Sequence, residues 1–211
     1  MVADGMGGHS GGKVASDIFQ AETATEFSDS DTPVVENIED RIRHCFNTAH
    51  LSIKNQTQKA PHLKGMGCTA NILVFNDQQF YIGHVGDSRT YRLRNHQLEQ
   101  LTTDHSLVQQ QLDLGLITRD QARNHKMRSV ILRAVGISDS LEIDILTGDV
   151  EAGDLFILCT DGLYAMLDDN QLFQILESDM LPDQKVSVLI DLANGAGGKD
   201  NITLILVSIA A

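Results

Sequence analysis

Residues 67–94 read GCTANILVFNDQQFYIGHVGDSRTYRLR, and this stretch decides the fold class. Three of its segments, 69–75, 79–85 and 90–93, are rich in the β-branched and aromatic residues that favour strands, and short polar turns separate them. Strands that follow one another directly are typical of antiparallel sheets, whereas a doubly wound parallel sheet needs a helix between successive strands. The stretch therefore predicts antiparallel pairing.

Helix-like segments lie before this strand run, and mixed blocks follow it. Residues 13–27 have a helix-compatible composition, and apolar side chains recur at spacings of three, four and seven across residues 35–53. Further along the chain, we predict strands at 141–146, 155–159 and 202–209, and helices at 170–177 and 183–193. Helix pairs thus flank the strand blocks, which predicts a layered α+β domain with antiparallel sheets.

The composition is that of one acidic globular domain. The 211 residues include 29 Asp and Glu against 16 Lys and Arg, which gives a net charge of -13. A chain this acidic lacks the basic surface that binding to phosphate backbones requires, so nucleic acid and anionic membranes are excluded as partners. The longest apolar stretch, 202–211, is about half the length of a membrane span. We therefore expect a soluble, cytoplasmic protein.

The three cysteines do not indicate a disulfide framework or a zinc site. Cys45, Cys68 and Cys159 are odd in number, lie in apolar surroundings and show no metal-binding spacing. A reducing compartment is the natural setting for such residues. This observation agrees with the cytoplasmic location that we expect.

Three aspartates stand where side chains could meet in one site. Asp4 lies in the glycine-dense segment 2–12, VADGMGGHSGG, which we interpret as an active-site loop. Glycines let the backbone take positive φ and let a ligand approach the main chain closely, so Asp4 is well placed to hold a metal or a phosphate. Asp161 and Asp200 stand at the edges of predicted strands. Because a rigid strand end positions its side chain at the rim of the sheet, we expect the three carboxylates to converge.

Six motifs, taken together and in this order, resemble those of bacterial metal-dependent Ser/Thr protein phosphatases of the PPM (protein phosphatase 2C-like) family. They are DGMGGH (4–9), GHVGDSR (83–89), LTTDHS (101–106), LRAVG (132–136), LCTDG (158–162) and KDNIT (199–203). The resemblance spans essentially the whole chain. It implies a β-sandwich of two antiparallel sheets flanked by helix pairs, with a binuclear Mn²⁺ or Mg²⁺ centre at one end of the sandwich.

The resemblance also implies a set of metal ligands. Asp4 resembles the carboxylate that bridges both metals, and Gly5 resembles the backbone carbonyl ligand of one of them. Asp161 and Asp200 resemble ligands of the other metal. Asp104 is similar to the aspartate that, with the equivalent of Asp161, holds a weaker third ion in bacterial members. Ligation by oxygen alone suits Mg²⁺ or Mn²⁺, and two such ions about 3.5–4 Å apart activate water for in-line attack on phosphorus.

The sequence departs from the family pattern at its beginning. Family members carry an Arg that holds the substrate phosphate and an acidic pair that supports the second metal, both on a strand just before the DGxGG loop. We therefore expect one domain, residues 1–211, that lacks its first strand or strands. The general-acid His of some members stands two positions after the bridging Asp, where this chain has Met6, and His9 is the nearby candidate for that role. Residues 108–133 resemble the mobile flap beside the site.

The sequence thus predicts a protein phosphatase that hydrolyses phosphoserine and phosphothreonine in substrates of a Ser/Thr kinase, and we expect it to be a monomer. The alternative is a catalytically impaired PPM-like module with a regulatory or interaction role, which the missing strand favours. Retention of Asp4, Asp161 and Asp200 argues against that alternative, because carboxylates that crowd together repel one another without metal.

For other short patterns, we weigh a functional interpretation against a structural one. Residues 7–13 nearly match a P-loop, but Val14 lacks the hydroxyl that such loops place on Mg²⁺. Asp87 and Arg89 could be catalytic, but we favour a structural interpretation in which they bond the turn and each other. His105 either contacts substrate or is a polar residue at a helix start.

Overall fold

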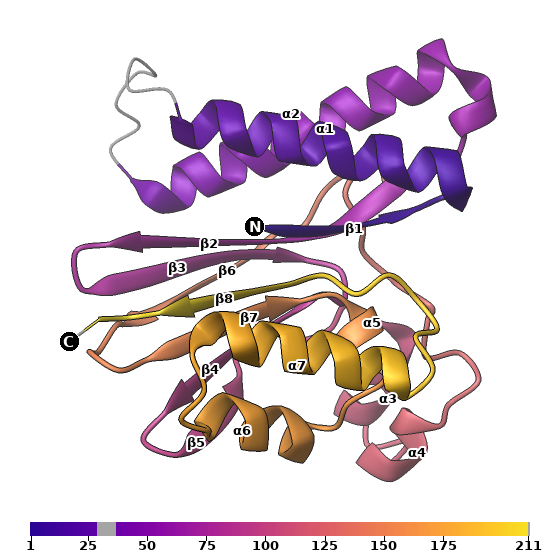
Figure 1. Cartoon of the computed structure of the whole chain (residues 1–211). Coiled ribbons are helices and arrows are strands. Elements are labelled where there is room, and N and C mark those ends of the chain that lie inside the picture. The colour runs from indigo at the N-terminus through magenta and orange to yellow at the C-terminus, as the bar shows by residue number, and fades with distance from the viewer. Residues whose placement is uncertain (29–36, 211) are drawn as a thin grey trace.

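The computed structural model of the chain describes residues 1–28 and 37–210, apart from the side chain of His9. Four layers make up this part of the chain (Figure 1). Two four-stranded antiparallel sheets face each other, and helices cover the outer face of each sheet. The predicted α+β sandwich of antiparallel sheets with flanking helix pairs is therefore confirmed.

The first sheet has the strand order β1-β2-β3-β6. Its strands are β1 (Val2–Met6), β2 (Gly67–Asn76), β3 (Gln79–Val85) and β6 (Asp144–Asp149). Two long helices, α1 (Gly8–Ser28) and α2 (Ile38–Lys59), pack on its outer face. The register places Asp4 opposite Thr69, on the edge strand of this sheet.

The second sheet has the strand order β5-β4-β7-β8. Its strands are β4 (Arg89–Arg94), β5 (Gln97–Gln100), β7 (Leu155–Cys159) and β8 (Leu204–Ser208). Helices α6 (Asp169–Glu177) and α7 (Pro182–Gly195) cover its outer face. Arg89 pairs with Cys159, so the first residue of β4 lies beside the end of the strand that leads into Asp161.

Three apolar interfaces hold these layers together. Between the first helix pair and its sheet, the rings of Phe19 and Phe46 meet edge to face at 4.9 Å. Between the sheets, Phe156 packs against Phe75 and Phe80, with 5.3 Å between ring centroids in each pair. The third interface, under α6 and α7, contains Leu163, Leu172 and Leu189. Burying each of these large side chains stabilises the fold by roughly 1.5–3 kcal/mol.

The space between the sheets is polar at the end next to Asp4. Asn71 Nδ2 donates to the carbonyl of Ser88 at 2.9 Å and to Thr90 Oγ1 at 3.2 Å, and so joins the two sheets. Thr69 Oγ1 and Ser88 Oγ lie 2.7 Å apart and make a second link. The amide of Asp4 donates to Thr69 Oγ1 at 3.3 Å. Because these buried polar groups satisfy one another, they fix the relative position of the sheets next to Asp4.

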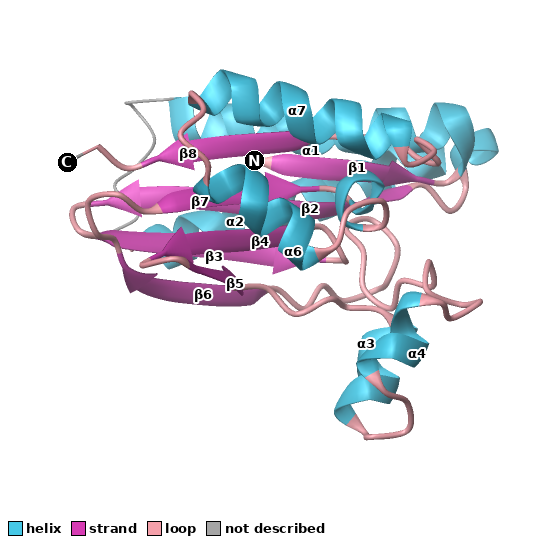
Figure 2. Cartoon of the chain, turned by 60° about the horizontal axis from the view of Figure 1, so that its bottom comes forward, coloured by secondary structure: helices cyan, strands magenta, loops and turns pink. Residues whose placement is uncertain are grey.

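Residues 107–133 form a lobe that projects from the layers (Figure 2). It contains α3 (Leu107–Asp113) and α4 (Arg119–Arg123), and a capping box at Thr118 starts the second helix. Two antiparallel backbone segments make its stem: the amide of Leu107 donates to the carbonyl of Val130 at 2.9 Å, and that of Leu132 to His105 at 2.7 Å. We call residues 107–133 the lobe from here on.

The glycine-rich start of the chain differs from the expected loop. Asp4 lies within a strand, because residues 2–6 pair with β2, and α1 begins at Gly8 rather than at residue 13. Pairing with a neighbouring strand thus overrides the local preference of glycine for turns. Val35, the first residue of the apolar pattern predicted for the second helix, lies outside the described residues.

Some short elements escape the sequence pattern. The strand expected at 141–146 is β6, at residues 144–149, and β5, the 3-10 helix η1 (Pro61–Leu63) and the helix α5 (Asp161–Tyr164) were not predicted. They span three to four residues, which is too short for a hydrophobic period to show. Within the part of the chain that the structure describes, no helix is both long and apolar enough to cross a membrane.

Candidate functional site

Asp4, Asp161 and Asp200 lie near one another although they come from distant parts of the chain. Asp4 is on the edge strand β1, Asp161 begins α5 after β7, and Asp200 lies in the loop before β8. These elements meet at one end of the sandwich (Figure 1). A hollow of about 590 Å³ is lined by Asp4, Gly5, Thr160 and Asp200, and Asp161 directly follows Thr160.

The electrostatics of the site reflect the mutual repulsion of these carboxyls. The pKa of Asp4 rises from 3.8 to about 7, first because the group is buried and then because the charges of Asp161 and Asp200 oppose its ionisation. Burial, followed by the charge of Asp200, also raises the pKa of Asp161. Carboxylates that crowd one another in this way favour either protons or a bound cation. The arrangement is therefore chemically suited to hold cations.

The backbone around Asp161 and Asp200 is locked together. Thr160 Oγ1 donates to the carbonyl of Asn201 at 3.1 Å and accepts from the amide of Thr203 at 3.1 Å. A Cβ at Gly162 would lie 2.2 Å from the carbonyl oxygen of Asn201, so only glycine allows this approach. The amide of Asn201 donates to Asp200 Oδ1 at 2.8 Å and orients that carboxylate.

Glycines bring β1 and the start of α1 into similar contact. A Cβ at Gly5 would lie 2.0 Å from the carbonyl oxygen of Gly12, so the strand and the helix touch along their backbones. Gly7 and Gly8 line the hollow together with Lys13. The Lys13 side chain is 74% exposed and pairs with Asp17 at 2.6 Å, so it is an exposed residue of α1. The glycines thus leave main chain, rather than side chains, around Asp4.

The residues of the hollow fit Mg²⁺ or Mn²⁺. Asp161 Oδ1 is buried and has no hydrogen-bond partner among the described residues, and such an atom calls for a ligand. The donors are oxygens, which hard divalent cations prefer. Within residues 1–28 and 37–210, no three His, Cys, Asp or Glu side chains are grouped as ligands of one ion. Carbonyl oxygens and water would complete the shell of such an ion beside the carboxylates.

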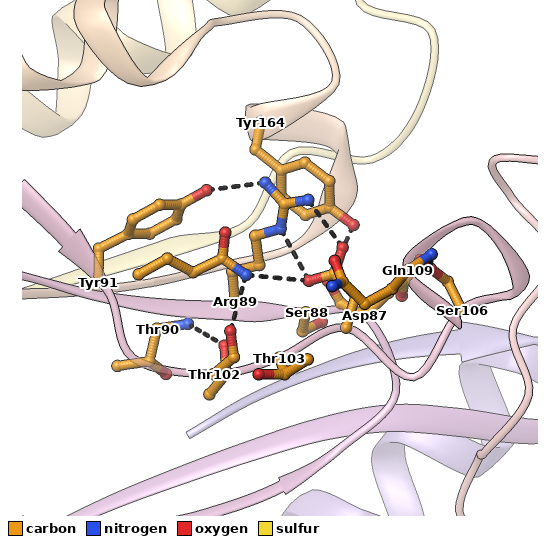
Figure 3. A network of polar contacts seen from close by, with 12 residues as sticks. Asp87, Ser88, Arg89, Thr90, Tyr91, Thr102, Thr103, Ser106, Gln109 and Tyr164 are labelled. Carbon is orange, nitrogen blue, oxygen red and sulfur yellow. Dashed lines mark hydrogen bonds and ion pairs between the residues drawn. The ribbon is translucent and has the colours of Figure 1, made fainter. Parts of the chain in front are cut away.

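Asp104 lies in a separate ion-pair network rather than in the lining of the hollow. Arg89 donates to both carboxylate oxygens of Asp104, from Nε at 2.9 Å and from Nη2 at 2.7 Å. The same guanidinium donates to the hydroxyl of Tyr91 at 3.0 Å and lies 3.7 Å from the ring centre of Tyr164. Figure 3 shows Arg89 between the two tyrosines. The expectation that Arg89 pairs with Asp87 is therefore wrong: the partner of Arg89 is Asp104.

Asp87 belongs to the electrostatic surroundings of the site, which the sequence interpretation missed. Burial raises its pKa to about 7, and the charges of Asp161, Asp104 and Asp4 add to the effect. The hydroxyl of Tyr164 donates to the backbone carbonyl of Asp87 at 2.8 Å. Asp87 follows the end of β3 closely, as Asp161 follows the end of β7. The strand-end rule that selected Asp161 could therefore have selected Asp87 too.

The two histidines considered for function differ in what can be said of them. The side chain of His9 lies outside the described part of the structure. His105 Nδ1 accepts from the amide of Gly86 at 3.1 Å, so the neutral ring carries its proton on Nε2 and donates to Asp144 Oδ2 at 3.1 Å. Both ring nitrogens are thus engaged within the protein, which favours the structural interpretation of His105. Ser106, the next residue, caps α3.

Comparisons with known proteins show the family of the chain. The family model described as Protein phosphatase 2C matches residues 1–189. The chain is 37% identical over 208 residues to the serine/threonine phosphatase stp of Listeria monocytogenes, covering 98% of this chain and 82% of that protein. It is 34% identical over 208 residues to the protein phosphatase PhpP of Streptococcus pneumoniae, covering 99% of this chain and 84% of that protein.

Solved structures show the same architecture. The serine/threonine phosphatase PstP/Ppp of Mycobacterium tuberculosis superposes with a TM-score of 0.90 at 33% identity, over 99% of this chain and 87% of that one. The catalytic domain of PstP in complex with two manganese ions gives a TM-score of 0.87 at 32% identity, over 99% and 86% of the two chains. The resemblance that the six motifs indicate is thereby confirmed, and the chain belongs to the protein phosphatase 2C family.

Proposed function

We propose that this protein hydrolyses phosphoserine and phosphothreonine in other proteins with the help of two Mn²⁺ or Mg²⁺ ions. The observation that carries the proposal is the convergence of Asp4, Asp161 and Asp200 around a hollow, with Asp161 Oδ1 buried and unpartnered among the described residues. The relatives named as serine/threonine phosphatases and the manganese-bound PstP structure support it.

Each ligand has a defined role in this proposal. Asp4 would be a ligand of both ions, and the backbone carbonyl of Gly5 would be a ligand of one of them. Asp161 and Asp200 would hold the other ion, and the hydrogen bond from Thr160 to Asn201 keeps both residues on rigid backbone. When bound, the pair of ions supplies a water of lowered pKa and positive charge for the phosphoryl oxygens. The chain itself orients the phosphate, which can approach the main chain of Gly7 and Gly8 closely.

The cysteines support a mechanism without a thiolate nucleophile. Burial raises the pKa of Cys45 to about 11 and those of Cys68 and Cys159 to about 12. All three thiols are therefore protonated at neutral pH, and a protonated thiol is a poor nucleophile. Attack on phosphorus by activated water needs no covalent intermediate.

Two further roles belong to the same proposal. Asp104, with Asp161, is the candidate for a third and weaker ion, which would have to share Asp104 with Arg89 because both oxygens already accept bonds from that residue. His9 is the candidate general acid. We also propose that the substrates are targets of a Ser/Thr kinase, that the protein acts in the cytoplasm, and that it is a monomer.

The test is hydrolysis of a phosphothreonine peptide with and without millimolar Mn²⁺, for wild type and Asp161→Asn. We expect turnover that needs both the metal and Asp161. Turnover by Asp161→Asn equal to that of wild type would overturn the ligand assignment. A chain that binds Mn²⁺ but hydrolyses no phosphopeptide would instead support the catalytically impaired regulatory module.

A further inference from the structure

Exposed apolar side chains gather on the lobe. Nine large hydrophobic side chains are strongly exposed in the described part of the chain, and five of them lie between residues 114 and 132. They are Leu114, Leu116, Met127, Val130 and Leu132. Leu114 and Leu116 are 67% and 69% exposed, at the turn between α3 and α4. A concentration of this kind on a soluble protein marks an interaction site more often than scattered exposed residues do.

The lobe is also basic in an otherwise acidic molecule. Residues 107–133 contain five Lys and Arg and two Asp, whereas the whole chain carries a net charge of -13. Of the five, Arg133 pairs with Asp144 and Glu142 at the stem. Arg119, Arg123, Lys126 and Arg128 form no ion pair with any carboxylate of the described residues. Four exposed cations thus stand beside the exposed apolar side chains.

The stem holds this surface in a fixed direction. Arg133 Nη1 donates to Asp144 Oδ1 at 3.1 Å, and His105 donates to the other oxygen of the same carboxylate at 3.1 Å. The backbone bonds of Leu107 and Leu132 close the stem from both sides. Inside the lobe, α3 and α4 contact each other, and Val108 and Ala122 are buried. The exposed side chains therefore lie on an ordered surface that the stem holds in place.

The surface lies beside the carboxylate site. Val135, two residues after the lobe, exchanges two backbone hydrogen bonds with Cys68, at 3.1 and 2.8 Å. Cys68 lies opposite Gly5 in the register of β1 and β2, so the root of the lobe is next to Asp4. A phosphorylated residue bound at the hollow would therefore place its neighbouring residues within reach of the lobe.

We propose that the lobe surface formed by Leu114, Leu116, Arg119, Arg123, Lys126 and Met127 docks an acidic and apolar segment that flanks the phosphorylated residue of a protein substrate. This proposal rests on the proposed function and adds the chemistry of the substrate. Acidic residues complement the four free cations and steer the encounter, and apolar residues cover the exposed leucines. The rest of the chain carries the excess of carboxylates, which repels acidic flanks.

Three phosphothreonine peptides of equal length test the preference, with flanks of Glu and Leu, of Ser and Gly, or of Lys and Leu. With Mn²⁺ present, we expect kcat/KM to be about tenfold higher for the acidic peptide than for the basic one, mainly through KM. The advantage should shrink in about 0.5 M NaCl, because salt screens exposed charges. Equal kcat/KM for all three peptides would overturn the proposal.

A charge-reversal variant connects the preference to the lobe. Arg119→Glu with Arg123→Glu should remove the preference for the acidic peptide. It should leave the hydrolysis of p-nitrophenyl phosphate unchanged, because that substrate is too small to reach the lobe. The matched control is Arg43→Glu with Lys59→Glu on α2, which changes the net charge equally on exposed residues of another layer. If the control variant loses the preference as the lobe variant does, the effect is one of net charge and the proposal fails.

Two further measurements distinguish a failure of the lobe proposal from a failure of the proposed function. If p-nitrophenyl phosphate is not hydrolysed, the proposed function fails. The lobe is then judged from fluorescence anisotropy of the same labelled peptides in EDTA, where wild type should bind the acidic peptide more tightly than Arg119→Glu with Arg123→Glu does. Cosedimentation with phosphatidylserine vesicles tests the other partner that a basic, apolar surface could take. Vesicle binding that requires the lobe, together with no peptide preference, would overturn the proposal.

Discussion

The carboxyl of Asp4 is partly buried beside two other carboxyls, and its raised pKa is the consequence. Asp87 and Asp161 share this condition, because burial raises the pKa of each and neighbouring carboxylates add to it. Such a cluster destabilises the metal-free protein, since folding must bring like charges together. A functional site that costs stability without its ligand is common, and binding of that ligand offsets the cost.

The first prediction concerns Asp4→Asn in EDTA. With a folded-state pKa of about 7 against an ordinary 3.8, the folded protein keeps a proton between these values that the unfolded chain has released. The folded state then binds more protons than the unfolded state, so the contribution of Asp4 to stability falls as the pH rises through this window. Asn does not titrate. The variant should therefore match wild type near pH 4 and exceed its melting temperature near pH 8.

The comparison with the variant is needed because other groups act in the opposite sense. Burial and the charge of His105 lower the pKa of His84 to about 4, so the unfolded chain binds more protons and stability rises with pH. This contribution is common to wild type and Asp4→Asn and cancels in the difference. Saturating Mn²⁺ should reverse the order at neutral pH, because only wild type keeps the bridging ligand. A difference that is constant with pH would contradict the raised pKa.

The second prediction concerns Arg89→Lys. Arg89 forks onto both oxygens of Asp104 and also bonds Tyr91, and an ammonium cannot reproduce this planar pattern. Because Asp104 is only 9% exposed, its weakened pairing should cost about 1–3 kcal/mol, measured by urea unfolding in EDTA.

Arg92→Lys is the matched control for this change. Arg92 lies on the same strand, and its partner Glu99 is exposed, so the change should cost less than about 1 kcal/mol. Equal losses of stability in Arg89→Lys and Arg92→Lys would show that the two-bond pair of Arg89 with Asp104 contributes no more to stability than an exposed ion pair.

At the scale of elements, long strands were predictable and short elements were not. The predicted strands at 79–85 and 155–159 coincide with β3 and β7, because their apolar runs are buried in the sandwich. β5 reads QLEQ and has no such run, since most of its side chains are exposed. β1 is a strand only because it pairs with β2, which lies more than sixty residues away, and local composition does not report such pairing.

The candidate site was likewise predictable from the sequence only in part. The order of motifs and the strand-end positions indicated Asp4, Asp161 and Asp200 from sequence, and the structure places them around one hollow. The partnership of Arg89 with Asp104 was not predictable. It joins residues 15 positions apart through the packing of β4 against the loop after β5, and nothing in either segment specifies the other. Asp87, in contrast, was missed although it follows a strand end as Asp161 does.

The third prediction concerns the contact between α5 and the loop that carries Asp200. In Gly162→Ala, the new methyl group would meet the carbonyl of Asn201 at 2.2 Å, so the loop must move and carry Asp200 with it. Overpacking of this kind costs about 1–3 kcal/mol. We expect weaker Mn²⁺ binding by isothermal titration calorimetry and a kcat/KM about tenfold lower, since misplacement of about 1 Å has large effects on positioned groups.

Gly195→Ala is the matched control for this change. Gly195 ends α7 and no atom lies within 4 Å of an added Cβ, so alanine there should be neutral or stabilise the protein by up to about 1 kcal/mol. Unchanged Mn²⁺ affinity in Gly162→Ala would show that the loop is not fixed by this contact.

At the scale of the whole molecule, the site joins the two sheets. Asp4 lies on the edge strand of the first sheet, while Asp161 and Asp200 stand next to β7 and β8 of the second. The link between Thr69 and Ser88 crosses between the sheets at the same end. Without a cation, carboxyls on both sheets repel one another there. Ligation by Asp4 together with Asp161 or Asp200 would tie the sheets together.

The last prediction follows from this position. Mn²⁺ at about a hundred times its dissociation constant should stabilise the fold by about 2.7 kcal/mol, because it binds the folded state alone. Hydrogen exchange should slow in β1, α5 and β8 together, since one centre holds elements of both sheets. Asp161→Asn should lose the effect in both sheets at once, although its substitution lies in only one of them. Protection confined to the second sheet would mean that Asp4 does not share the ions, and the bridging role assigned to it would be wrong.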